Sequence, residues 1–70
     1  MIHMKIDVWK VKLIMAQKGY SRLDVAKMGG ITTQTVGNAI RKGYCTTKTI
    51  PKLAKGLGVP VTEIVVEDGT

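Results

Sequence analysis

Two side-chain amides, those of Gln34 and Asn38, stand four residues apart in a stretch of helical periodicity. Residues at this spacing lie on one face of an α-helix, and each amide can pair with the edge of an adenine at N6 and N7. Thr33 stands beside them, and its methyl group can contact the methyl group of thymine. These residue types predict contacts to bases in a DNA major groove, whereas the simpler interpretation is an ordinary solvated helix face.

Phosphate contacts are predicted from basic and hydroxyl-bearing side chains that flank the same stretch. Lysine and arginine pair with phosphate oxygens, and hydroxyl groups add hydrogen bonds to them. The residues expected in this role are Arg22, Arg41, Lys42, Tyr44, Thr46, Thr47 and Lys48. Lys52 and Lys55 are expected on a solvated outer face instead.

The sequence contains no set of residues with the types and spacing that catalysis or metal binding requires. His3 is the only histidine, Ser21 the only serine and Cys45 the only cysteine, and they show no spacing typical of metal ligands. We therefore expect no enzyme, no metal, no cofactor and no small-molecule ligand. Cys45 is expected to pack as a small hydrophobe, and a single cysteine fits a reducing cytoplasm. No apolar run of membrane-spanning length occurs, so no membrane partner is expected.

Two short helices joined by a glycine turn must position the amides. Ser21 is expected to cap a helix over residues 22–29, and Thr32 to cap a second helix over residues 33–42. Gly30 lies between them, where the turn requires a positive φ. Such a pair forms a helix-turn-helix, whose second helix enters the major groove of DNA.

The segment Val25–Ile40, VAKMGGITTQTVGNAI, resembles the small Cro and lambda-repressor-like helix-turn-helix regulators. The resemblance covers roughly residues 7–65, and VAKMGG, TVG and KLAKGLGVPVTEIV are most similar to short stand-alone regulators of phages and conjugative elements. It implies an all-α, five-helix DNA-binding domain that acts as a transcriptional repressor. It also implies a homodimer on double-stranded DNA with two-fold symmetry. Gly29 replaces the Ala or Leu usual in the family, which predicts an under-packed turn.

The remaining elements are expected to complete one domain over residues 1–70. Helices are predicted over residues 8–18, capped by Asp7, and over residues 48–57, with Thr49 as an alternative cap. Residues 1–6 are expected to form an arm or a short extended segment, which could pair with residues 64–66. A loop is expected at 44–47, and Thr62 and Glu63 are expected to open a fifth helix. Residues 67–70 are expected to form a polar tail. Trp9 is expected to be half-buried.

The charges divide the chain into two parts. The chain carries 11 basic and five acidic residues, a net charge of +6. All 11 basic residues precede Gly58, whereas the last thirteen residues hold three of the five acidic ones and no base. A basic body predicts a phosphate-facing surface. The acidic end also carries the apolar residues Val59, Val61, Ile64, Val65 and Val66, which are predicted to supply the dimer contact. The alternative function is a protein-interaction module on the same fold, such as an antitoxin-like or assembly partner.

Overall fold

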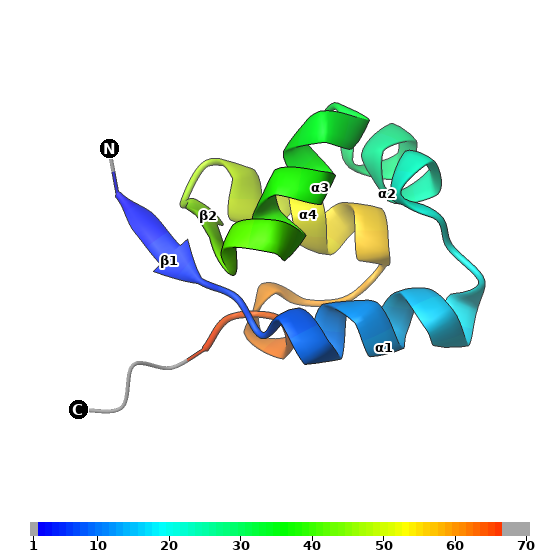
Figure 1. The fold of residues 1–70 in the computed structure, drawn as a ribbon, viewed down its shortest axis with the longest axis horizontal. Helices are drawn as coiled ribbons and strands as arrows, with labels where there is room; N and C mark the ends of the chain where they lie inside the picture. The colour runs from blue at the N-terminus through cyan, green and yellow to red at the C-terminus, as the bar shows by residue number, and fades with distance from the viewer. Residues whose placement is uncertain (1, 67–70) are drawn as a thin grey trace.

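The computed structural model describes residues 2–66, which form four α-helices, one 3₁₀ helix and a two-stranded sheet (Figure 1). In chain order the elements are β1 (His3–Lys5), α1 (Val8–Lys18), α2 (Arg22–Gly29), α3 (Thr33–Lys42), β2 (Tyr44–Thr46), α4 (Thr49–Leu57) and η1 (Val61–Glu63). The expectation of a strictly all-α domain of five helices is therefore wrong in its fifth helix and in its lack of strands. The expected tail at residues 67–70 lies outside the described residues.

Local capping sets the bounds of the first three helices. Asp7, Ser21 and Thr32 are the N-caps of α1, α2 and α3, and each side chain accepts a hydrogen bond from the backbone N–H three residues further along. This contact satisfies one of the N–H groups that a helix start leaves without a partner. Gly30 ends α2 with a φ of 71°, in the left-handed region. The predicted bounds of these helices are confirmed.

α4 provides the centre of the core, because its apolar residues recur every three or four positions. It packs against α1, α2, β2 and η1, and α1 runs along the edge of the molecule beneath it in Figure 1. The largest fully buried side chains are Leu53, Leu57, Ile64, Val11, Val25 and Val36. α4 begins at Thr49, so Pro51 lies in the first turn, where its missing N–H needs no partner.

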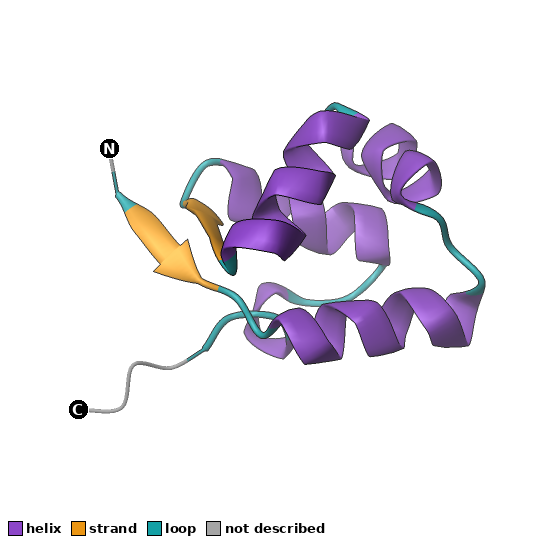
Figure 2. Ribbon diagram, in the orientation of Figure 1, coloured by secondary structure: helices purple, strands orange, loops and turns teal. Residues whose placement is uncertain are grey.

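The two strands form an antiparallel ribbon at one end of the helices (Figure 2). Met4 pairs with Cys45 at the centre of this β1–β2 ribbon. The predicted loop at 44–47 is thus wrong over Tyr44–Thr46, because pairing with a strand some forty residues away holds it extended. The extended alternative for the N-terminal segment is confirmed, and the conceivable pairing with the C-terminal segment is reduced to one bridge between Ile6 and Val65.

A single turn of 3₁₀ helix replaces the predicted fifth helix. Only Val61–Glu63 are helical, since Val65 already joins the bridge to Ile6. The backbone N–H groups of Ile64 and Val65 both donate to the carbonyl oxygen of Val61, at 3.1 and 3.2 Å, so the segment closes a single tight turn and does not continue as an α-helix.

Two residues lie in surroundings that differ from the sequence expectation. Trp9 is 75% exposed, because it lies on the face of α1 opposite the buried Val11 and Ile14. Gly29 is buried, and a Cβ atom there would lie 2.4 Å from the carbonyl oxygen of Lys52. The turn is therefore closely packed rather than under-packed, and α4 occupies the space that a side chain would need.

Candidate nucleic-acid interface

The α2–turn–α3 unit holds its second helix by caps and by a buried inner face. The side chain of Thr32 accepts from the N–H of Thr35 at 3.0 Å, which starts α3 at Thr33. Ala26 of α2 and Val36 of α3 are both buried. The opposite face of α3 is thereby left toward solvent.

The predicted base-contacting residues lie on that outer face but differ in their surroundings. Thr33 and Gln34 are exposed in the first turn of α3. Asn38 is half-buried, and its Oδ1 accepts from the guanidinium of Arg41 at 3.0 Å. Since a guanidinium only donates, the amide oxygen of Asn38 is engaged and its NH₂ group points elsewhere.

Arg22 belongs to the same surface, although it starts α2. A Cβ atom built on Gly37 would lie 3.5 Å from Nη1 of Arg22, so this guanidinium lies over the middle of α3. The structure therefore brings a predicted phosphate-contacting side chain next to the predicted base-contacting ones.

The remaining predicted phosphate-contacting residues follow α3 in the chain. Arg41 and Lys42 are exposed at its end, Tyr44 is exposed on β2, and Thr47 and Lys48 are exposed before α4.

Thr46 is half-buried and acts within the protein. Its hydroxyl lies 2.9 Å from that of Thr49 and accepts the backbone N–H of Thr49 at 3.3 Å. Its side chain therefore takes the place of a helix cap in front of α4.

A hollow of about 170 Å³ separates α3 from the β1–β2 ribbon. Asn38 and Lys42 line it from α3, and Tyr44 lines it from β2. His3 and Thr35 also line it, although sequence reasoning assigned neither to the site. The sequence predicted an arm or a short extended segment here, and only the pairing shows that it is a strand and which neighbour it has.

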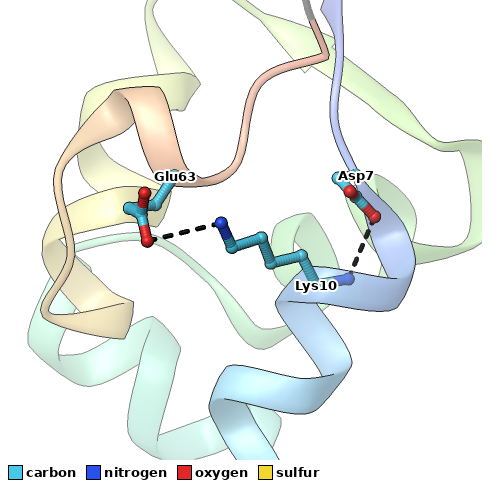
Figure 3. Close-up of polar contacts among 3 residues, drawn as sticks. All are labelled: Asp7, Lys10 and Glu63. Carbon is cyan, nitrogen blue, oxygen red and sulfur yellow. Dashed lines mark hydrogen bonds and ion pairs between the residues drawn. The ribbon is translucent and has the colours of Figure 1, made fainter.

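The three carboxylates within residues 2–66 have partners outside the predicted contact residues. Glu63 forms an ion pair with Lys10 at 3.3 Å, and Asp7 caps α1 (Figure 3). Asp24 accepts from the backbone N–H of Ser21 at 2.9 Å and from its hydroxyl at 3.0 Å, and these hydrogen bonds hold the pKa of this carboxyl below its usual value. Within residues 2–66, the basic side chains of the site form no ion pair.

Cys45, the other candidate residue, has a structural role. Cys45 is 9% exposed, and burial raises the pKa of its thiol, so it packs as the small hydrophobe that the sequence predicts. Within residues 2–66 no three histidine, cysteine or acidic side chains gather as metal ligands would. None of the helices in that range has the length and apolar character needed to cross a membrane.

Comparison with protein families yields one match. A family model described as helix-turn-helix matches residues 11–64, well over half of the chain. The matched segment contains α2, the turn and α3. No curated protein and no solved structure matches the chain in the corresponding comparisons.

Proposed function

Because the chain belongs to the Cro/C1-type helix-turn-helix family of DNA-binding regulators, we propose that α3 enters the major groove and reads a specific sequence. Thr33, Gln34 and Asn38 contact base edges in this proposal. The observation that carries it is the outer face of α3, where Thr33 and Gln34 are exposed beside the guanidinium of Arg22. A second helix with polar side chains beside basic ones is what groove entry requires.

The sugar–phosphate backbone is contacted on either side of α3. Charged contacts to phosphate orient the protein on the duplex, and they contribute to affinity without reading sequence. The proposed phosphate contacts are Arg22, Arg41, Lys42, Tyr44, Thr46, Thr47 and Lys48. Thr46 shares its hydroxyl with Thr49, so its contribution is smaller than that of the exposed residues.

The regulator acts as a repressor of phage or mobile-element type. A protein that occupies an operator through a groove-filling helix blocks access to the same DNA, which is the simplest route to repression. One chain of 70 residues covers little DNA, so a homodimer on a two-fold operator is proposed to supply the affinity. Its place of action is the cytoplasm, where the operator lies. The whole chain of residues 1–70 is proposed to act as one domain.

Replacement of Gln34 tests base reading directly. Gln34→Ala should cost about 1–3 kcal/mol at a site selected from random DNA. Binding to a scrambled duplex should hardly change, because the side chain is uncharged. Competition binding against both duplexes measures the ratio, and Asn38→Ala should lower it as well.

The matched control is Gln17→Ala, which removes an exposed amide from α1. It should leave both affinities unchanged. If Gln34→Ala and Asn38→Ala both keep the full discrimination between the two duplexes, α3 does not read bases through these amides.

A protein-interaction role is the second candidate, and the outer face of α1 favours it. Trp9 is 75% and Leu13 44% exposed, four residues apart on one helix face. A helix that is apolar on both faces commonly has a partner on each. Salt titration separates the two roles, because DNA binding that neutralises several phosphates weakens steeply with salt.

A further inference from the structure

We infer that the hollow between α3 and the β1–β2 ribbon holds the sugar–phosphate chain of one DNA strand, with His3 of β1 as an additional phosphate contact. This inference rests on the proposed function and extends the interface beyond the helix-turn-helix. It makes the N-terminal strand part of the binding surface. The hollow has a volume of about 170 Å³, and a phosphodiester group fits into it.

The hollow lies where the DNA backbone that borders the major groove would pass. Asn38 and Lys42 follow Gln34 at intervals of four residues, so all three lie along one side of α3. A rise of 1.5 Å per residue puts Lys42 about 12 Å along the helix from Gln34, and a major groove is about 12 Å wide. The β1–β2 ribbon adjoins the end of α3 (Figure 1). When Gln34 reaches bases, this end of α3 and the ribbon therefore meet the DNA backbone.

The groups that line the hollow suit an anion. None of its lining residues is acidic, and Lys42 brings a positive charge. The oxygen of Asn38 is held by Arg41, so its NH₂ group is the part left to donate. Tyr44 also lines the hollow, is 41% exposed, and carries a hydroxyl that can donate. Hydrogen-bond donors around a positive charge are the usual surroundings of a phosphate.

The ribbon holds His3 at this rim. Antiparallel pairing places His3 opposite Thr46. Its ring packs edge-to-face against that of Tyr44, with 5.3 Å between the ring centroids. Both rings are thus fixed in relation to α3, although β1 lies some thirty residues before that helix in the chain. The preorganised pair can meet a phosphate without first being ordered.

Phosphate-ethylation interference on a selected site tests the inference with the full chain. Tyr44→Phe removes only a hydroxyl, and His3→Ala removes the ring that packs against Tyr44. Each should weaken binding about fivefold, the loss expected for one hydrogen bond. The loss should be the same on selected and scrambled duplexes, and interference should fade at one phosphate in each half-site. Tyr20→Phe, which alters the only other tyrosine, should change neither.

The outcomes separate this inference from the proposed function. If wild type discriminates between duplexes through Gln34 while His3→Ala and Tyr44→Phe bind as wild type does, the hollow holds no backbone and this inference alone fails. If wild type shows no sequence preference and no salt dependence, the proposed function fails and the inference fails with it. Thermal unfolding midpoints equal to wild type show that both variants keep the fold.

Discussion

Gln34 and Asn38 have the same chemistry and share a helix face, yet they occupy different positions in the structure. Gln34 is exposed. Asn38 is half-buried beside the ribbon and already accepts from Arg41. A residue with one engaged group can make fewer new hydrogen bonds, so we expect Gln34 to contribute more to discrimination between bases.

Individual lysines at the site can be tested by their effect on salt dependence. Lys42→Ala and Lys48→Ala should each weaken specific and non-specific binding alike, and lower the salt slope by about one unit. Lys48 makes no side-chain capping hydrogen bond to α4, so its loss leaves that helix intact. Filter binding over a range of salt concentrations gives the slopes. Lys12→Ala on α1 is the control, and unchanged slopes in both site variants would remove these lysines from the interface.

At the scale of elements, α2 and α4 cross so closely that each needs a glycine. A Cβ atom on Gly29 would lie 2.4 Å from the carbonyl oxygen of Lys52 in α4, and one on Gly56 would lie 2.3 Å from that of Val25 in α2. Real Cβ atoms do not approach backbone oxygens so closely, and backbone cannot move aside as a flexible side chain can. This crossing holds α2 in place, and α2 in turn supports α3.

Gly29→Ala should therefore destabilise the protein by about 2 kcal/mol, within the range of overpacked cores. For a chain of this size such a loss lowers the melting temperature by roughly 10 °C. Gly37→Ala is the matched control, because its nearest neighbour is Nη1 of Arg22 at an ordinary 3.5 Å. It should stabilise α3 by up to about 1 kcal/mol. Equal melting temperatures for the two variants would mean that the α2–α4 crossing is looser than these distances imply.

At the scale of the whole molecule, the outer face of α1 is an alternative to the C-terminal segment as the contact of the proposed homodimer. Ile64 is fully buried and Val65 joins the bridge to Ile6, so the C-terminal segment uses much of its apolar surface within its own chain. Val61 is 36% exposed. The outer face of α1, with Trp9 at 75% exposure, offers a larger apolar surface. Tryptophan is among the residues that contribute most to interfaces.

Trp9→Glu should consequently raise the dissociation constant of the proposed homodimer at least tenfold, since a central tryptophan commonly contributes more than about 1.4 kcal/mol. Sedimentation equilibrium measures this constant. The melting temperature of the monomer should hardly change, because the side chain is exposed. Val61→Glu is the comparison variant. If only Val61→Glu causes dissociation, the C-terminal segment supplies the dimer contact instead.

Much of the helical framework could be predicted from the sequence because its determinants are local. A cap and its N–H partner lie three residues apart, as for Ser21 and Asp24. The apolar stripe of α4 repeats within one helix. The turn at Gly30 needs only the φ of one residue. The candidate site was predictable to the same extent, since Thr33 and Gln34 follow from the position of the cap Thr32.

The tertiary structure decided what depends on residues far apart in the chain. The strand at Tyr44–Thr46 exists through its pairing with His3–Lys5, and this pairing brings His3 to the end of α3. The need for glycine at position 29 arises from a carbonyl of α4, and the exposure of Trp9 from the lack of a neighbour on that face of α1 among the described residues. Periodicity and capping report contacts within one or two helical turns, whereas pairing, crossing and exposure are properties of elements that meet only after the chain has folded.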